Sequence, residues 1–329
     1  MSSTSDQRVL LVTNVYPTQA DPTRGVFVAR QMRAVNAILQ RPVEIVVVGK
    51  TGAGGLLRSR RAVADAIRRF APDVVHVYYG LSGAALPLSL TQPVVLTLCG
   101  SDVFRWRIWR DMKGLLEYVI SMATARRARA VVVQSGAIRD ALPAGRLRRR
   151  TEIMETGTDV GLFRPEDRSA CRRKLGWDTD RHVVLFGAAP ERAVKRYDLA
   201  VEACKTLADQ FALDVTLRTI RGVLPASVPT YLNAADCLLI TSDWEAGPIV
   251  FTEALACGVP VVTVPVGYAT EARWPPDYVR VTAPTPHTLA AMLADVLRTA
   301  PAHERPKDLA LPTEADYAAR LVALYERIA

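Results

Sequence analysis

One segment joins the end of a strand, a loop, a helix and the start of the next strand: Thr241-Ser-Asp-Trp-Glu-Ala-Gly-Pro-Ile-Val-Phe-Thr-Glu253-Ala-Leu-Ala-Cys-Gly258-Val-Pro260-Val-Val. The apolar runs Cys237–Thr241 and Val261–Val264 predict buried strands on either side of a helix at Pro248–Ala256. Gly258 and Pro260 end that helix before the second strand begins. A strand, a helix and a further strand in this order predict an α/β protein with a parallel sheet covered by helices.

The same alternation runs through the chain and restarts after Pro165. In the first half we expect strands at Val9–Thr13, Val43–Val48, Val74–Val77, Val94–Leu98, Val131–Gln134 and Glu152–Met154, and helices at Phe27–Leu39, Ser59–Phe70, Arg110–Arg127 and Ala137–Leu142. In the second half we expect further strands at Val183–Phe186, Asp214–Thr219 and Val279–Val281, and helices near Tyr197–Gln210, Pro229–Ala235, His287–Ala300 and Glu314–Ile328.

This restart predicts two Rossmann-like domains, residues 1–160 and residues 161–312, joined by a hinge at Asp159–Arg168. Ligands of such folds bind beyond the carboxyl ends of the strands. We therefore expect the functional residues directly after the strands, in a cleft between two facing domains.

Composition agrees with a protein of this kind. The chain has 329 residues, of which 50% are hydrophobic, and this excludes a disordered or disulfide-stapled design. Charged residues interrupt every apolar run before it reaches the ~18 residues of a membrane span. The five cysteines form no CxxC pair, and the N-terminal residues lack the pattern of a secretory signal. These features predict a cytoplasmic protein whose cysteines are reduced and bind no metal.

The excess of positive over negative charge lies in the first half of the chain. Residues 1–165 contain 24 Lys and Arg against 12 Asp and Glu, whereas residues 166–329 contain 18 against 21. Such a one-sided field indicates an anionic partner, for example a lipid surface or a phosphate-bearing substrate. The alternative is an arginine-rich composition on ordinary solvated helices.

The loop of the opening segment carries a candidate site. Glu245 precedes the helix and Glu253 lies eight residues later, about two helical turns on, so both carboxylates can face one side. Gly247 and Pro248 begin the helix, whose first N–H groups have no partner within it and attract an anionic or hydroxyl-rich ligand. The alternative is an ordinary helix with two solvated carboxylates.

The segment resembles the E-x7-E motif of retaining glycosyltransferases with the GT-B fold, specifically the pattern of glycosyltransferase family 4. The resemblance extends over nearly the whole chain. It includes these further blocks: Val9–Pro17, Asp21–Val28, Asp73–His76, Leu98–Asp102, Thr156–Pro165 and Tyr231–Asp236.

The resemblance implies roles for individual residues. Glu253 would accept hydrogen bonds from the ribose of the donor, and Glu245 would hold hydroxyls of the transferred sugar. The same sugar hydroxyls would be held by backbone amide groups in the stretch Ala246, Gly247, Pro248 and Ile249.

Cations after the first strand of the second domain would neutralise the leaving diphosphate, a requirement of the chemistry itself. Lys195 matches the family's lysine. Arg192 lies three residues before it, where the family usually has a wider spacing, and Arg196 is an alternative. Gly25 would let the backbone approach the donor closely, or it is simply a turn glycine. The terminal helix, at about residues 313–329, would pack back onto the first domain.

Two positions depart from the family pattern. Cys99 stands where many relatives have a histidine before Gly-Ser-Asp102, and Thr156 replaces the usual asparagine. Cysteine cannot supply the hydrogen bonds of histidine, so we expect Cys99 to line the donor pocket without acting as a nucleophile, and Asp102 to bind acceptor hydroxyls. Cys99 as a buried strand-end residue is the alternative. His76 either contacts the acceptor or is a packed, hydrogen-bonded histidine.

Other motif-like strings predict nothing. Gly49-Lys50-Thr51 lacks the upstream glycine of a phosphate loop, and Asp178-Thr-Asp180 precedes a strand, at the wrong end for a metal site. Tryptophan beside arginine in Arg105–Arg110, with the basic runs Arg126–Arg129 and Arg146–Arg150, is typical of a membrane boundary. An acceptor-pocket wall is the alternative, and a nucleic-acid partner is not expected.

The sequence thus predicts a retaining hexosyltransferase that acts at the inner face of the membrane or in the cytoplasm. It would move a hexosyl or N-acetylhexosaminyl group from a nucleoside diphosphate sugar, with UDP favoured, to a hydroxyl acceptor such as a lipid-linked glycan, a polysaccharide or a small molecule. The mechanism expected from the family needs no metal and no further cofactor. The alternatives are an inactive protein that binds sugar nucleotides, and an inverting transferase or epimerase of the same fold.

Overall fold

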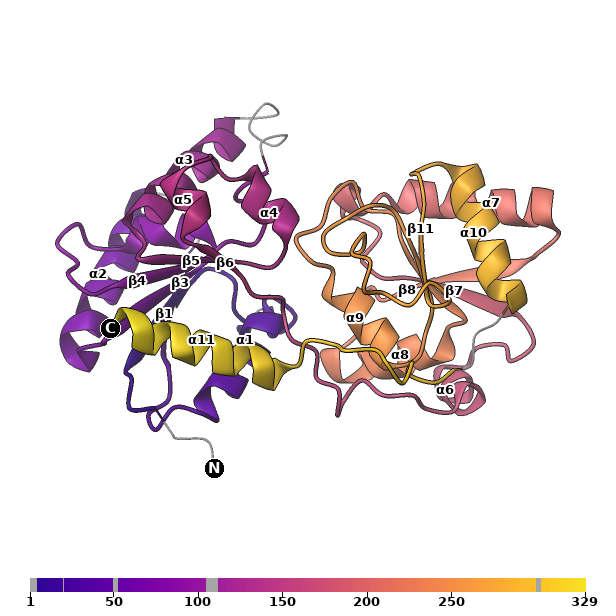
Figure 1. Cartoon of the computed structure of the whole chain (residues 1–329), viewed down its shortest axis with the longest axis horizontal. Coiled ribbons are helices and arrows are strands. Elements are labelled where there is room, and N and C mark those ends of the chain that lie inside the picture. The colour runs from indigo at the N-terminus through magenta and orange to yellow at the C-terminus, as the bar shows by residue number, and fades with distance from the viewer. Residues whose placement is uncertain (1–4, 20, 50–52, 105–111, 300–302) are drawn as a thin grey trace. The chain divides into compact units, whose positions relative to one another are not determined.

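The computed structural model describes residues 5–19, 21–49, 53–104, 112–299 and 303–329. It divides into two compact units, each with its own parallel sheet (Figure 1). Unit 1 comprises Met1–Gly157 together with Glu314–Ala329, and unit 2 comprises Thr158–Thr313. The chain enters and leaves unit 2 side by side, because Thr158 and Thr313 form an isolated parallel bridge.

Unit 1 contains a six-stranded parallel sheet in the order β2-β1-β3-β4-β5-β6. Its strands are β1 (Val9–Thr13), β2 (Glu44–Val47), β3 (Val74–Tyr78), β4 (Val94–Thr97), β5 (Ala130–Val133) and β6 (Thr151–Ile153). Its helices are α1 (Val26–Asn36), α2 (Ala53–Phe70), the 3-10 helix η1 (Gly80–Ala85), α3 (Met112–Arg127), α4 (Gly136–Ala141), α5 (Arg146–Arg149) and α11 (Glu314–Ile328).

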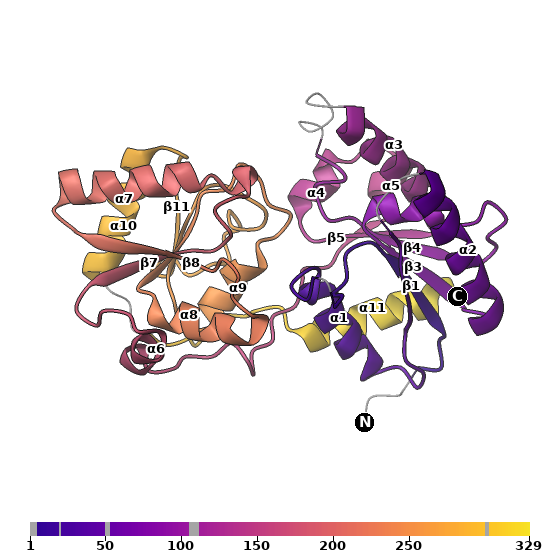
Figure 2. The ribbon, with the colours of Figure 1, turned by 180° about the vertical axis from the view of Figure 1, so that it is seen from behind.

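The central strands of this sheet are covered on both faces. Every residue of β1, β3, β4 and β5 is buried, as expected for apolar strands of a parallel sheet. Helices α1 and α11 lie on one face, and α2 and α3 lie on the other (Figures 1 and 2). The C-terminal helix therefore completes the core of unit 1, where Tyr317, Leu321 and Tyr325 pack against Val28 and Met32 of α1.

Unit 2 contains a five-stranded parallel sheet in the order β11-β10-β9-β7-β8. Its strands are β7 (His182–Phe186), β8 (Val215–Thr219), β9 (Cys237–Ile240), β10 (Val261–Thr263) and β11 (Val279–Val281). Its helices are α6 (Arg168–Leu175), the 3-10 helix η3 (Ala193–Lys195), α7 (Tyr197–Phe211), the 3-10 helix η4 (Pro225–Ser227), α8 (Val228–Ala234), α9 (Ile249–Ala256) and α10 (Pro286–Thr299).

The eleven predicted strands are all confirmed, with ends that differ by one residue at most. Helix α2 begins at Ala53 rather than at Ser59, so Gly54 and Gly55 lie inside its first turn. The end of the expected hinge, Arg168, is instead the first residue of α6. Asp167 caps that helix by accepting a hydrogen bond from the amide of Ala170 at 2.6 Å.

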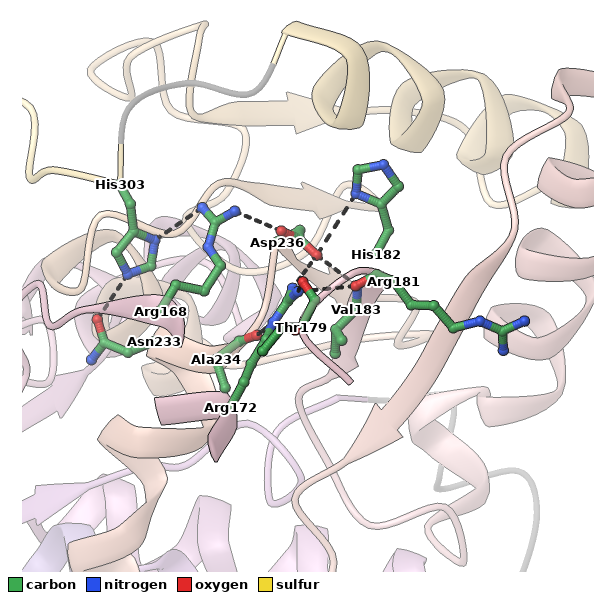
Figure 3. A network of polar contacts seen from close by, with 10 residues as sticks. All are labelled: Arg168, Arg172, Thr179, Arg181, His182, Val183, Asn233, Ala234, Asp236 and His303. Atoms are coloured by element: carbon green, nitrogen blue, oxygen red, sulfur yellow. Dashed lines mark hydrogen bonds and ion pairs between the residues drawn. The ribbon is translucent and has the colours of Figure 1, made fainter. Parts of the chain in front are cut away.

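A buried polar network attaches α6 to the edge of the sheet where β7 and β9 begin (Figure 3). Asp236 accepts hydrogen bonds from Arg168 Nη1, from Arg172 Nη2 and from the amide of Val183, each at 2.6 Å. His303 extends the network, because its Nδ1 lies 3.3 Å from Arg168 Nη2. Burial lowers the pKa of His303 to about 4, so the neutral ring accepts this hydrogen bond. The network lies at the amino ends of the strands and stabilises the fold.

Candidate active site

The strand order of unit 2 reverses direction between β7 and β9. At such a switch point the two following loops turn away from each other and leave a crevice at the carboxyl ends of the strands. The loop after β7 leads to η3, and the loop after β9 leads to α9. These two loops carry Lys195 and Glu245 respectively, so the sheet topology itself brings the two side chains to one place.

Lys195 and Glu245 form an ion pair between Nζ and Oε1, with side chains only 14% and 13% exposed. Ser242 Oγ donates a second hydrogen bond to the same carboxylate oxygen at 2.6 Å. Partial burial strengthens this pair relative to a solvated one and fixes the ammonium in position. Since an ammonium group has three donors, Lys195 can keep Glu245 as a partner and still bind an anionic ligand.

The backbone around the pair is fixed from both loops. Thr241 Oγ1 lies 2.9 Å from the carbonyl oxygens of both Lys195 and Arg196, and it donates to them. The amide of Asp243 donates to the carbonyl of Val194 at 2.9 Å. The end of β9 is therefore bonded directly to η3, and the position of Lys195 relative to Glu245 does not depend on long side chains alone.

The start of α9 is held by the loop after β10. Tyr268 donates a hydrogen bond from its hydroxyl to the carbonyl of Pro248 at 3.0 Å. Gly267 has φ +55°, and a Cβ there would lie 3.0 Å from Pro248 Cδ, so this close approach requires glycine. The start of α9 is therefore fixed, and the first amide groups of a helix, which lack partners within it, favour negative charge nearby.

A small pocket of unit 2 brings together part of the predicted set. Lys195, Glu245 and Pro248 line it, together with Gly187 after β7 and Val250 in the first turn of α9. Ala246 and Gly247 in the preceding loop and Ile249 at the start of α9 are partly buried but do not line the pocket. Glu253 is buried on α9 and does not line the pocket.

The two arginines of the predicted set differ from each other. Arg196 binds the carboxylates of Asp198 and Asp243, at 3.0 Å and 3.2 Å, and these hydrogen bonds raise its pKa. Arg192 is exposed and makes no ion pair within the described part of the chain. Of the two arginines, Arg192 is therefore the one whose charge is not balanced by a carboxylate of the described residues.

Unit 1 has a cavity at its own switch point, between β1 and β3. The cavity measures about 670 Å³ and is lined by residues from the ends of both strands, among them Asn14 and Tyr79. Ser82 Oγ accepts a hydrogen bond from the amide of Asn14 at 3.0 Å and thereby closes one wall. Arg24 and Lys113 supply two cations. Sequence reasoning missed these residues, although the position of Asn14 directly after the first strand was a usable signal.

The three residues predicted for an acceptor or sugar pocket in unit 1, His76, Cys99 and Asp102, do not line this cavity. Asp102 is buried, and its two oxygens accept hydrogen bonds from the amides of Cys99 and Gly80 at 3.0 Å and 2.9 Å. Burial raises the pKa of Asp102 to about 6 in spite of these bonds. The carboxylate of Asp102 thus joins the loops after β3 and β4, and its contact with acceptor hydroxyls stays a prediction. Cys99 lies in the same loop, and burial raises the pKa of its thiol.

Gly25 is explained by the fold. It has φ +66°, and a Cβ at this position would lie 2.5 Å from the carbonyl oxygen of Val15. Only glycine fits such a conformation and such a contact without a shift of backbone. Of the two readings open from the sequence, the turn glycine accounts for the residue completely.

His76 is the packed histidine of the two alternatives. It is fully buried within β3, with Nδ1 2.6 Å from the hydroxyl of Tyr325 in α11 and Nε2 2.8 Å from Thr97 Oγ1. Burial lowers its pKa to about 3. Its place in the core accounts for both ring nitrogens, and the bond to Tyr325 fixes α11.

This buried ring gives unit 1 a pH dependence. The folded-state pKa of about 3 lies below the ordinary value of 6.5, so the stabilisation is present above pH 6.5 and is lost as the pH falls toward 3. We expect the free energy of unfolding to fall by about 1.4 kcal/mol per pH unit over this window from His76 alone. Urea unfolding at pH 7 and pH 4.5 measures it: His76→Gln should show a smaller loss than the wild type. His287→Gln, at an exposed position, is the control, and an equal loss in all three proteins would contradict the assignment.

Two parts of the chain match known families. Residues 8–162 match Glycosyltransferase Family 4, and residues 213–309 match Glycosyl transferases group 1. The chain is 27% identical over 143 residues to D-inositol 3-phosphate glycosyltransferase of Mycobacterium tuberculosis. That match covers 36% of this chain and 30% of the relative, so it spans less than a third of the relative's length.

Similar solved structures cover the whole fold. Sucrose-phosphate synthase of Thermosynechococcus elongatus has a TM-score of 0.75 at 18% identity, over 98% of this chain and 99% of that one. The Anabaena protein HepE in complex with UDP-glucose has a TM-score of 0.66 at 18% identity, over 98% of each chain. Two parallel α/β domains of this kind define the GT-B fold. The chain has this fold and, over the matched residues, it is similar to glycosyltransferases of family 4 and group 1.

Within the described ranges, no three His, Cys, Asp or Glu side chains gather as a metal site. None of the helices in that part of the chain is both long enough and apolar enough to cross a bilayer.

Proposed function

We propose that the protein is a retaining transferase that moves a hexosyl or N-acetylhexosaminyl group from a nucleoside diphosphate sugar to a hydroxyl acceptor. The observation that carries this proposal is the Lys195–Glu245 pair at the switch point of unit 2, beside the N-terminus of α9. A fixed ammonium, a carboxylate and the amide groups at the start of a helix are together suited to bind a sugar that carries a diphosphate.

The reaction proposed is a displacement on one face of the sugar. The bond between the anomeric carbon and the β-phosphate oxygen breaks while the acceptor oxygen bonds to that carbon from the same side. The acceptor's proton moves to the β-phosphate, and the anomeric configuration is retained. Lys195 and the exposed Arg192 would meet the charge that develops on the diphosphate, which is the step where fixed cations contribute most. No metal ion is required in this scheme.

The remaining donor contacts follow from the positions of the other residues. Glu245 would accept hydrogen bonds from sugar hydroxyls, and Glu253 would contact the ribose. We favour a UDP-sugar as the donor, because the similar structure of HepE contains UDP-glucose.

The acceptor is proposed to carry an anionic group, because Arg24 and Lys113 line the cavity of unit 1. The name of the mycobacterial relative also includes a phosphate on the sugar alcohol, which agrees with such an acceptor. A lipid-linked acceptor carries a phosphate as well, and it would bring a cytoplasmic enzyme to the inner surface of the membrane.

Of the alternatives, an inverting transferase or epimerase requires a base at the site. His76 does not provide one, since it is buried and both of its ring nitrogens are bonded within the fold. A protein that only binds sugar nucleotides remains the competing function, and the test below separates it from a transferase.

Thermal unfolding with UDP, GDP, ADP and their common sugar conjugates tests donor binding. A nucleotide at 100 times its dissociation constant should stabilise the fold by about 2.7 kcal/mol. We expect UDP and one UDP-sugar to raise the melting temperature by several degrees. Equal, negligible shifts for all nucleotides would contradict the proposal. Release of UDP with phosphorylated acceptors, and the anomer of the product by NMR, then distinguish a retaining transferase from a binding protein.

A further inference from the structure

Helix α3 of unit 1 exposes its apolar side chains. Met112, Leu116 and Val119 are 80%, 59% and 53% exposed, and Leu115 is 38% exposed. The spacings of three, four and seven residues place all four on one face of the helix. A helix of a globular protein normally buries its apolar stripe, whereas α3 exposes these four side chains.

The opposite face explains why the stripe remains outside. The helix packs on η1 through small side chains, and a Cβ at Gly80 or at Gly83 would lie 2.3 Å from Ser121 Oγ or 2.1 Å from Thr124 Oγ1. Thr124 also donates a hydrogen bond to the carbonyl of Gly80 at 3.3 Å. The close glycine contacts fix which face is inward, and the apolar face has no role in the core of unit 1.

The C-terminal end of α3 leads into a basic pocket of about 620 Å³. We call it the arginine pocket; its guanidinium groups belong to Arg126, Arg127, Arg129, Arg146 and Arg150. It lies where β4 and β5 begin, at the opposite edge of the sheet from the cavity of unit 1. Helices α3 and α5, which supply most of its arginines, lie side by side in both views (Figures 1 and 2).

The arginine pocket is built from backbone contacts, and its charge is not balanced. Arg127 Nη2 donates to the carbonyl of Pro87 at 3.0 Å, and Arg150 Nη2 donates to the carbonyl of Ala125 at 2.5 Å. Among the residues that the structure describes, none of the five arginines pairs with a carboxylate. Burial and the neighbouring charge of Arg146 lower the pKa of Arg150. Arg127 and Arg150 are therefore held by backbone carbonyls, and the charge of all five arginines is available to an anion.

We propose that the apolar face of α3 and the arginine pocket form one docking surface for a bilayer that contains anionic phospholipid. The four apolar side chains would enter the boundary between headgroups and acyl chains, while the arginines bind headgroup phosphates. Arg126 and Arg127 follow Val119 by seven and eight residues, so they continue the same helix face as the stripe.

Charge complementarity favours a membrane over a protein partner as the occupant. Four apolar side chains form a narrow stripe, and the arginine pocket at its C-terminal end is lined by five arginines and by no carboxylate among the described residues, which suits a surface of repeated phosphates. The inference deepens the proposed function, because it identifies the surface that would bring a lipid-linked acceptor to the enzyme. It rests on that function for its purpose, although the docking itself needs neither donor nor acceptor.

Sedimentation with lipid vesicles tests this surface. One set of vesicles is pure phosphatidylcholine, and the other also contains about 30% of the anionic lipid phosphatidylglycerol. We expect the wild-type protein to bind only the anionic vesicles. The triple variant Arg126→Gln, Arg129→Gln, Arg146→Gln should bind them about a hundredfold more weakly, since each basic residue near such a surface contributes on the order of 1 kcal/mol. The double variant Leu116→Ser, Val119→Ser should also weaken binding, by about tenfold or more.

A matched control removes three exposed arginines elsewhere on unit 1, with Arg33→Gln, Arg58→Gln and Arg61→Gln. An equal loss in this control would overturn the proposal, because net charge and not this surface would then explain binding. Wild-type binding by the serine variant would overturn the role of α3, and tight binding of inorganic phosphate that blocks vesicle binding would indicate a site for a free anion instead. UDP binding, measured by calorimetry in each preparation, distinguishes failure of docking from failure of the proposed transferase function.

Discussion

Replacement of Lys195 by alanine is expected to lower kcat about 10²- to 10³-fold. The ammonium is nearly buried, paired with Glu245 and fixed through Thr241, so it is already oriented when charge develops on the leaving diphosphate. Removal of one preorganised donor of this kind typically costs ~2.7–4 kcal/mol of transition-state stabilisation. The measurement is UDP release with saturating donor, and kcat should fall more than the affinity for UDP does, because the charge is largest in the transition state.

Two companion variants make this result specific. Glu245→Gln keeps the shape of the side chain but removes its charge, and it should also lower turnover, since Lys195 then loses the carboxylate that positions it. Lys205→Ala removes an exposed lysine from α7 and should leave kcat unchanged. Wild-type turnover in Lys195→Ala, with an intact melting temperature, would contradict the assignment of the site.

The sequence predicted the elements of the fold because its apolar runs are short, uninterrupted and separated by amphipathic helices. What it could not provide is the order of strands in each sheet. Only that order shows that the loops after β7 and β9 lie next to each other, which brings Lys195 to Glu245 although they are 50 residues apart. The resemblance to family 4 supplied this pair in advance, and physical patterning alone did not.

Two site residues predicted in unit 1 have partners that the sequence does not reveal. His76 and Asp102 are polar residues in or after strands, and from sequence alone a polar residue there indicates a site. In the structure the ring of His76 is bonded to Tyr325 from α11, a helix 249 residues away, and Asp102 is bonded to backbone amides. A partner so distant in sequence cannot be inferred from local pattern.

The segment Arg105–Arg110, predicted as a membrane boundary, lies outside the described residues.

The network around Asp236 leads to the second large expected effect. Asp236→Asn should lower the free energy of unfolding of unit 2 by about 3–5 kcal/mol, because Arg168 and Arg172 then lose the carboxylate that balances both of their charges. Arg172 is buried, so its guanidinium cannot recover this loss by hydration. For a unit of this size each kcal/mol corresponds to about 2–4 °C in melting temperature, and the expected fall is about 6–20 °C.

An exposed ion pair of the same unit provides the comparison. Asp214 lies 3.0 Å from Arg181, and both side chains are exposed to solvent, so Asp214→Asn should cost about 1 kcal/mol or less. Hydrogen exchange in β7 and β9 would locate the loss in unit 2, because the amide of Val183 is bonded to Asp236. If the two variants unfold at the same temperature, burial does not strengthen the network. If Asp236→Asn alone unfolds early, the edge of the sheet opposite the active site holds that site in place, since β7 and β9 carry both loops that position Lys195 and Glu245.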